Sequence, residues 1–250
     1  MDMSPRLSFA VDAAYKGGRS TLGLFQAGVE VMTKQDATPV TQADREAERL
    51  IRSLIAAQYP HDAILGEEEG GDTGALDRWV IDPIDGTKSF ISGVPLYSTL
   101  LSYESGGETE VAVCYFPALG DMFYAEKGGG AFLNGRPIQV SQRESVQGGI
   151  LCCGGSMFKD GNWQKIARIM NRALATRTWC DAYGHTLVAC GRVDAMLDPV
   201  VSHWDISSVS LIVREAGGRF TDFKGNDALA TEGLSTNGRL HEEILAALQP

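Results

Sequence analysis

One stretch of the chain carries most of its information, Trp79-Val80-Ile81-Asp82-Pro83-Ile84-Asp85-Gly86-Thr87-Lys88-Ser89-Phe90. Its opening apolar run predicts a buried strand that ends at an acid, because Pro83 has no N–H group to donate to a sheet. Asp85 then precedes Gly86-Thr87, where we expect a helix to begin. Carboxylates bind hard divalent cations, and the free N–H groups of a helix N-terminus bind phosphate. The stretch therefore predicts a metal-dependent phosphate site, whereas the simpler alternative is a turn in which Asp85 caps the helix.

The composition of the whole chain is that of an ordinary globular protein. Its 250 residues, 44% of them hydrophobic, are enough to bury one large core or two smaller ones. The formal net charge of −10 argues against a nucleic-acid partner, since basic surfaces bind phosphate backbones. No apolar run approaches the ~20 residues of a membrane span, and residues 1–9 lack the apolar core of a secretory signal. The five cysteines lack Cys-x-x-Cys spacing and predict buried thiols, so we expect a cytoplasmic protein without a membrane partner.

Acidic residues also follow a second apolar segment. Ala63-Ile64-Leu65 predicts a short buried strand that ends at Gly66-Glu67-Glu68-Glu69-Gly70. Taken alone, three adjacent acids indicate a solvated loop. Because this strand and the next one both end in acids, we expect Glu67 to lie close to Asp82 and Asp85.

Two further acids stand where helices are expected to begin. Asp44 lies in the first turn of a helix predicted from Thr41 through Gln58. Asp205 opens a helix whose following face is apolar. Both have a structural explanation, since acids cap helix N-termini and interact favourably with the helix dipole. Asp205 is also able to reach the other acids from the second half of the chain, whereas His203 is expected to be a structural residue.

Apolar periodicity and turn signals predict the remaining elements. The helices are expected over 4–29 (one helix, or two broken at Gly17-Gly18), 162–174, 182–190, about 205–216 and 240–248. The strands are expected over 96–105, 111–116, 122–125, 138–140, 149–153, 178–180, 195–197 and 219–221, with a loop over 33–41. Hairpin turns are expected at Ser105-Gly106-Gly107, Gly128-Gly129-Gly130 and Asn134-Gly135.

The order of these elements divides the chain into two parts. An antiparallel series precedes a polar segment around 141–149, and strands alternate with helices after it. We therefore expect an α/β protein with an α+β N-terminal lobe over residues 1–142 and an α/β C-terminal lobe over residues 143–250, which together make one catalytic unit.

The candidate residues together have the composition of a site for metal-assisted phosphate hydrolysis. Such a site needs carboxylates around a cation such as Mg²⁺, a water to attack, and donors for the phosphate oxygens. The expected cation ligands are Glu67, Asp82, the Ile84 carbonyl, Asp85 and Asp205. The N–H groups of Gly86 and Thr87 are expected to face the phosphate, and the Thr87 hydroxyl to orient the water.

Several motifs resemble the inositol monophosphatase-like family. They are Lys34, Asp36, Pro39-Val40-Thr41 and Ala43-Asp44; Gly66-Glu67-Glu68; the stretch from Trp79 to Thr87; and Trp204-Asp205 with Glu215-Ala216-Gly217-Gly218. The resemblance implies a layered αβαβα sandwich and a lithium-sensitive phosphomonoesterase with two or three Mg²⁺ ions, commonly in a homodimer. It also implies site residues: metal ligands Glu67, Asp82, Ile84, Asp85 and Asp205; substrate contacts at Asp85, Gly86, Thr87 and Asp205; and water activation by Thr87 with Asp44 or Glu67.

Within that family, two segments resemble the histidinol-phosphate phosphatases. They are Gly86 to Pro95 followed by Leu100-Leu101, and Cys180 to His185 leading into Leu187-Val188-Ala189. The resemblance implies hydrolysis of L-histidinol phosphate to L-histidinol and phosphate, in histidine biosynthesis. Asp181 and Asp198 are then expected to meet the cationic tail of this substrate, and Arg177 its phosphate end. The alternatives are an inositol-1-monophosphatase, a 3′(2′),5′-bisphosphate nucleotidase, and a metal-binding scaffold without activity.

Overall fold

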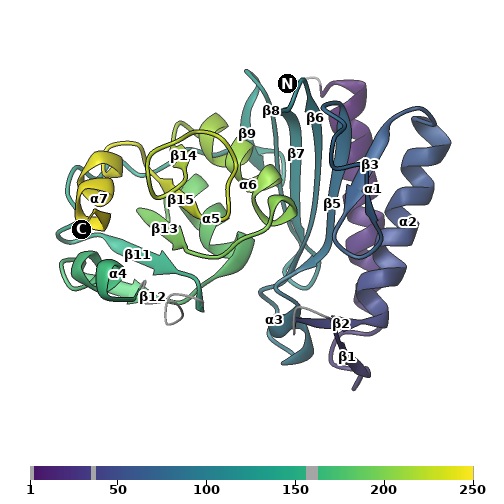
Figure 1. The fold of residues 1–250 in the computed structure, drawn as a ribbon, viewed down its shortest axis with the longest axis horizontal. Helices are drawn as coiled ribbons and strands as arrows, with labels where there is room; N and C mark the ends of the chain where they lie inside the picture. Colours follow the sequence, from purple (N-terminus) through teal and green to yellow (C-terminus); the bar gives the residue numbers. More distant parts are fainter. Residues whose placement is uncertain (1–2, 35–37, 156–162, 250) are drawn as a thin grey trace.

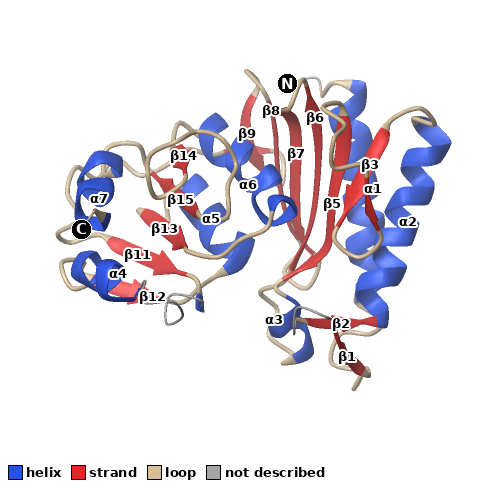
Figure 2. Cartoon of the chain, viewed as in Figure 1, coloured by secondary structure: helices blue, strands red, loops and turns tan. Residues whose placement is uncertain are grey.

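The computed structural model describes residues 3–34, 38–155 and 163–249, and these form five layers. Two helices cover the outer face of an eight-stranded sheet, and two others lie between this sheet and a five-stranded one (Figure 1). A further pair covers the far face of the smaller sheet (Figure 2). The αβαβα sandwich and the α/β fold class predicted from the sequence are confirmed.

The outer layer on the large sheet consists of two long helices, α1 (Pro5–Thr21) and α2 (Gln42–Gln58). Of the two possibilities for residues 4–29, the structure has one helix, shorter than expected, which passes through Gly17-Gly18 without a break. A Cβ on Gly17 would lie 2.6 Å from Ile51, and one on Gly18 would lie 2.6 Å from Tyr115. The two glycines therefore let α1 approach α2 and the sheet closely.

The large sheet has the strand order β10-β9-β8-β7-β6-β5-β3-β4. Its strands are β3 (Ala63–Gly66), β4 (Gly70–Gly71), β5 (Arg78–Asp85), β6 (Ser98–Ser105), β7 (Glu108–Phe116), β8 (Asp121–Glu126), β9 (Gly130–Leu133) and β10 (Arg136–Pro137). All neighbours pair antiparallel except β3 and β5, which are parallel. The three predicted hairpin turns connect consecutive strands of this sheet and are confirmed.

Two predictions for the first half of the chain are wrong. The segment 33–41, expected to be a loop, includes part of a short antiparallel pair, β1 (Val31–Thr33) and β2 (Pro39–Thr41). Residues 35–37, which include Asp36, lie outside the described residues. No strand covers 138–140, because the Val140 N–H group donates to the carbonyl of Ala216 and the chain leaves the sheet there.

The second half forms the smaller sheet and the helices around it. The strands are β11 (Ile150–Cys153), β12 (Ala175–Arg177), β13 (Ala195–Asp198), β14 (Arg219–Thr221) and β15 (Gly233–Thr236), in the order β12-β11-β13-β15-β14. The middle layer contains α5 (Asp181–Ala189) and α6 (His203–Glu215), and the outer layer contains α4 (Trp163–Met170) and α7 (His241–Leu248). Helix α6 also packs on β7 and β8, so it contacts both sheets.

Two predictions for the second half also fail. No strand forms over 178–180, because the edge strand β12 lies three residues earlier, at Ala175–Arg177. The short strand β15 is missing from the prediction, although it pairs with both β13 and β14. The expected first residue of α4, Asn162, lies outside the described residues.

The prediction of buried cysteines is confirmed for three of the five. None of the five cysteines, all of which lie in the described residues, forms a disulfide; Cys114, Cys152 and Cys153 are buried, and Cys180 and Cys190 are partly exposed. Within the described ranges, no helix combines the length and the apolar character needed to cross a membrane.

Candidate active site

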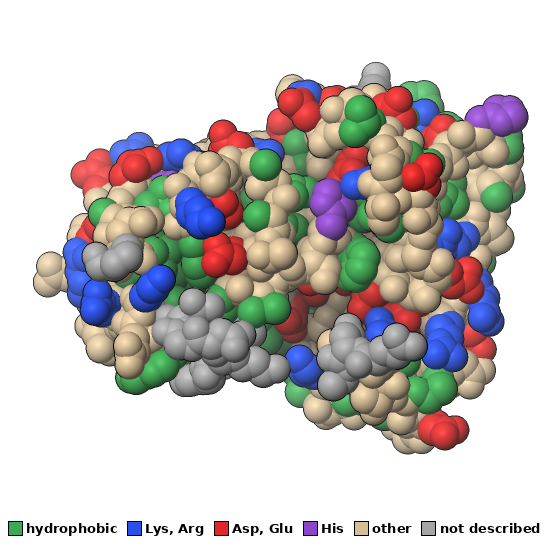
Figure 3. Space-filling view, viewed as in Figure 1, with side chains coloured by type: hydrophobic (Ala, Val, Ile, Leu, Met, Phe, Trp, Pro, Cys, Tyr) green, Lys and Arg blue, Asp and Glu red, His purple; other side chains and the backbone are tan. Residues whose placement is uncertain are grey.

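Asp82, Asp85 and Asp205 form the centre of the candidate site. One carboxylate oxygen of each lies within 4.8 Å of those of the other two, although Asp205 comes from the second half of the chain. Because β3 and β5 are parallel neighbours, Glu67 after the end of β3 lies beside Asp82, as predicted. Figure 3 shows acidic side chains at the junction between the two halves of the molecule. The fold therefore gathers acids from three separate segments.

Strand β5 does not end at Asp82, contrary to the prediction made from Pro83. It continues to Asp85, with a shift of register against β6 between Asp82 and Asp85. Such an irregularity accommodates a proline, which has no N–H group. The register shift also changes which way the two aspartates face. Residues three apart in a regular strand face opposite sides of the sheet, and the shift lets both aspartates face the same cluster.

Asp85 does not cap the helix that follows it, α3 (Thr87–Ile91), so the simpler alternative is wrong. The N-cap residue is Gly86, and no side chain caps this helix. Instead, Asp85 Oδ2 accepts hydrogen bonds from Ala182 N (2.8 Å) and Ser98 Oγ (3.2 Å). Ala182 lies in the first turn of α5, so Asp85 connects the large sheet to a helix of the second half.

Thr87 lies at the start of α3 and faces the first turn of α2. Its Oγ1 is 3.1 Å from the Ile84 carbonyl and 3.4 Å from Asp44 Oδ1. The other carboxylate oxygen of Asp44 accepts from Thr41 N (2.8 Å) and from Thr41 Oγ1 (2.6 Å). Asp44 therefore caps α2 with one oxygen and presents the other to Thr87. Its structural role is confirmed, and its role in water activation stays a prediction.

The loop that carries Glu67 is fixed by two residues not included among the predicted site residues. Glu48, fully buried on α2, accepts hydrogen bonds from Glu68 N (2.7 Å) and Glu69 N (3.0 Å). Lys34 Nζ donates to Glu67 Oε1 (2.8 Å) and to Glu68 Oε1 (2.6 Å). Glu48 lies four residues after Asp44 on the same face of α2, and this spacing is the feature of the sequence that could have indicated its place near the site.

The three aspartates have the electrostatics of a cation site. Burial, and then repulsion from neighbouring carboxylates, raises the pKa of Asp82 and of Asp85 well above the ordinary range. Burial likewise raises the pKa of Asp205 to about 7. Among the described residues, no Lys, Arg or His forms an ion pair with any of the three. Clustered carboxylates without a cationic partner repel one another, and a divalent cation removes this repulsion, so the residues present fit a metal.

Asp181 lies at the edge of this cluster in a strained conformation. It is the first residue of α5, with a φ of 57°, and burial raises the pKa of its carboxyl. The N–H group of Ala182, in the first turn of α5, donates to Asp85. The carboxylate of Asp181 therefore does not cap α5 through this group. A Cβ on Gly86, whose φ is 80°, would lie 3.1 Å from Asp181 Oδ2. The positive φ and this close approach both favour glycine at position 86.

The two other predicted substrate contacts lie at the carboxyl ends of parallel strands. Asp198 ends β13 and is buried beside Gly154, where a Cβ would lie 2.4 Å from Asp198 Oδ1. Arg177 ends β12, is exposed, and has its guanidinium 5.7 Å from the centre of the Trp179 ring. Neither belongs to the aspartate cluster. In α/β sheets, however, ligands bind beyond the carboxyl ends of the strands, and this edge is the one from which α5 begins.

A layered α/β sandwich with clustered aspartates beside a helix N-terminus fits a phosphatase that uses a metal ion. The family model "Inositol monophosphatase family" matches residues 2–250. The histidinol-phosphatase of Chlorobaculum parvum is 41% identical to this chain, and the match covers 98% of this chain and 97% of that protein. The histidinol-phosphatase of Mycobacterium tuberculosis is 36% identical, and the match covers 88% of each chain. The solved structure of a Thermotoga maritima IMPase superposes with a TM-score of 0.91 at 34% identity, covering 98% of this chain and 97% of that one.

The chain belongs to the inositol monophosphatase family, as its motifs predict. It is an enzyme, a phosphatase of small phosphorylated molecules from a metal-dependent family.

Proposed function

We propose that this protein is a Mg²⁺-dependent histidinol-phosphatase, which hydrolyses L-histidinol phosphate to L-histidinol and phosphate in histidine biosynthesis. The observation that carries this substrate is the carboxylate of Asp181 beside the aspartate cluster, held in a strained backbone conformation. Strain of this kind persists where the surrounding structure requires it, and it concentrates at functional sites. The similarity to histidinol-phosphatases over nearly the whole chain supports the same substrate.

The residues of the site have different roles in hydrolysis. Glu67, Asp82, the Ile84 carbonyl, Asp85 and Asp205 hold two or three Mg²⁺ ions. When bound, Mg²⁺ supplies Lewis-acid stabilisation of the phosphate and lowers the pKa of the attacking water. Thr87 Oγ1 orients that water and passes a proton towards Asp44, whose pKa is raised by burial. The N–H groups of Gly86 and Thr87, at the start of α3, bind the phosphate oxygens.

The substrate is distinguished by its tail. Histidinol phosphate carries an amine and an imidazole, so its non-reacting end is cationic, whereas inositol phosphate ends in neutral hydroxyls. Asp181 and Asp198 bind the cationic end, and Arg177 assists at the phosphate. A hydrogen bond to a charged group contributes about 1.5–3 kcal/mol, which corresponds to about one to two decades in the specificity constant.

A substrate panel at fixed Mg²⁺ tests this function. We expect kcat/KM for histidinol phosphate to exceed that for inositol 1-phosphate and for adenosine 3′,5′-bisphosphate, with no phosphate released in chelator. Higher activity on inositol phosphate would make the protein an inositol-1-monophosphatase of the same family. Activity on the bisphosphate alone would indicate the nucleotidase, and no activity on any ester would indicate a metal-binding scaffold.

The role of Asp181 is tested by Asp181→Asn. Asparagine tolerates the left-handed conformation, so the change removes charge with little backbone cost. We expect kcat/KM for histidinol phosphate to fall about tenfold or more, and that for a neutral phosphate ester to change little. The matched control is Asp194→Asn, a buried aspartate of the same half that bonds to Ser141 and Ile150. Equal losses on both esters would remove Asp181 from substrate recognition.

The proposal also includes a homodimer in the cytoplasm. Sedimentation equilibrium of the purified protein measures the mass of the assembly. A mass near that of one chain would contradict the homodimer.

A further inference from the structure

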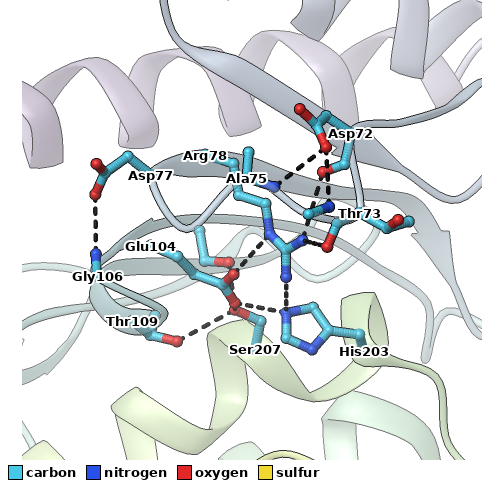
Figure 4. Close-up of polar contacts among 12 residues, drawn as sticks. Asp72, Thr73, Ala75, Asp77, Arg78, Glu104, Gly106, Thr109, His203 and Ser207 are labelled. Carbon is cyan, nitrogen blue, oxygen red and sulfur yellow. Dashed lines mark hydrogen bonds and ion pairs between the residues drawn. The ribbon is translucent and has the colours of Figure 1, made fainter.

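A buried ionic cluster joins the large sheet to α6, outside the candidate active site. Glu104 of β6 is 1% exposed, and its Oε2 accepts a hydrogen bond from Arg78 Nε of β5 (2.9 Å). Its Oε1 accepts from two groups of α6, His203 Nε2 (2.6 Å) and Ser207 Oγ (2.8 Å). Figure 4 shows these side chains converging on the Glu104 carboxylate. One carboxylate therefore links two strands and a helix.

The hydrogen bonds of this cluster leave little freedom to its members. Ser207 donates its single hydroxyl proton to Glu104, so it accepts from Ser102 Oγ (2.7 Å) and Thr109 Oγ1 (3.2 Å). His203 Nε2 lies 2.6 Å from Glu104 Oε1 and 3.2 Å from Arg78 Nη2, so the tautomer with a proton on Nε2 donates to Glu104 and does not accept from Arg78. Burial raises the pKa of Glu104, but hydrogen bonds from its three partners lower it more, and the pKa lies below its ordinary value. Directional bonds, in addition to apolar packing, thus fix α6 on the sheet.

The cluster holds both elements that carry the central aspartates. On α6, Asp205 lies between His203 and Ser207 within the first five residues of the helix. On β5, Arg78 and Asp82 are four residues apart and face the same side of the sheet. A small slip of α6 along the sheet would therefore change the distance between Asp205 and Asp82.

Stability alone is a poor explanation for this cluster. The cost of desolvating a buried ion pair is often as large as its attraction, and apolar residues of similar volume are often equally stabilising. Buried ionic groups are better suited to fixing one geometry. Metal ligands need such precision, because their distances tolerate only about 0.2 Å of variation.

We propose that Glu104 is a positioning residue, which sets the affinity of the site for divalent cations by fixing Asp205 of α6 against Asp82 of β5. This inference rests on the proposed function, because it takes the aspartate cluster as the metal site. Residues that orient metal ligands from outside the coordination sphere typically change metal affinity by about 10- to 100-fold when they are replaced.

Calorimetric titration of the metal-free protein with Mg²⁺ tests the proposal. Glu104→Gln keeps the side-chain shape but places an amide donor where one carboxylate oxygen accepts. We expect the Kd for Mg²⁺ to rise about tenfold. The matched control is Asp194→Asn, which weakens the contacts of another buried carboxylate, away from α6 and β5. It is expected to lower Tm to a similar extent and to leave the Kd unchanged.

The outcomes separate this inference from the proposed function. A wild-type protein that binds Mg²⁺ and a Glu104→Gln variant with the same Kd would overturn the positioning role alone. Equal losses of Mg²⁺ affinity in Glu104→Gln and Asp194→Asn would also overturn it, because a general loss of stability would then explain both. A wild-type protein that binds no Mg²⁺ would overturn the metal site itself and the positioning role with it.

A second variant decides the question if Glu104→Gln fails to fold. His203→Ala removes one bond to Glu104 from a side chain that is 31% exposed, and it keeps the pair between Glu104 and Arg78. We expect a smaller rise in the Kd for Mg²⁺, with Tm close to that of the wild type. An unchanged Kd in this folded variant would overturn the proposal.

Discussion

Asp82→Asn is expected to abolish catalysis while leaving the fold intact. Asp82 is 1% exposed and close to Glu67, Asp85 and Asp205, so we expect its charge to be central to the proposed cation binding. Losing the several kcal/mol of transition-state stabilisation that a metal supplies lowers kcat by about 10³-fold or more. The amide oxygen of asparagine retains the bond from Ile84 N to Asp82 Oδ1 (3.1 Å). Because the change also relieves repulsion among carboxylates, Tm in chelator is expected to stay the same or rise.

The control for this variant is Asp77→Asn, which precedes the same strand. Asp77 is exposed, and its Oδ1 accepts hydrogen bonds from Ser105 Oγ at the end of β6 and from Gly106 N in the turn that follows. Its replacement is expected to leave kcat and Mg²⁺ affinity unchanged. Near-normal turnover of Asp82→Asn at saturating Mg²⁺ would exclude Asp82 from the site.

The centre of the site was predictable because its residues follow local signals. Glu67 and Asp82 stand at the ends of apolar runs, and Asp44 and Asp205 stand at helix starts. Strand ends and helix starts are encoded by a few neighbouring residues. The parallel pairing of β3 and β5 then converts that local placement into proximity.

The errors in the fold arose where tertiary contacts override local composition. Strand β15 is short and contains Ser235 and Thr236, so it has no apolar pattern. It is nevertheless fully buried between two strands, because Ser235 Oγ pairs with His185 and Thr236 Oγ1 with His241. At Pro83, a register shift replaces the strand end that the absence of an N–H group predicts.

The supporting residues of the site were not predictable for a similar reason. Glu48 binds a loop 20 residues away, and Glu104 binds α6 about a hundred residues away. A buried carboxylate such as Glu104 is indistinguishable in the sequence from an exposed acid on a strand. Only the packing of α6 on the large sheet shows which acids are buried and what they hold.

Metal-free protein is expected to lose stability as the pH rises, and Mg²⁺ to offset that loss. Burial raises the pKa of Asp205 to about 7 in the folded protein, whereas an unfolded aspartate titrates near ~4. Between these values the folded state binds more protons than the unfolded state, so the free energy of unfolding falls as the pH rises. The stabilisation from the protonated carboxyl is complete below about pH 4 and is lost above about pH 7. Asp82 and Asp85 contribute in the same direction.

The measurement is Tm in chelator and in Mg²⁺ across this range of pH. Mg²⁺ binds the ionised carboxylates in competition with protons, so the difference in Tm between the two conditions is expected to grow from about pH 5 to pH 8. At a Mg²⁺ concentration of about 100 times the Kd, the stabilisation is about 2.7 kcal/mol. Groups elsewhere titrate equally in both conditions and cancel in the difference. In Asp82→Asn, which we expect to bind Mg²⁺ weakly, the difference in Tm is expected to be small at every pH. A wild-type difference that stays constant or shrinks as the pH rises would mean that these aspartates are not the groups that bind Mg²⁺.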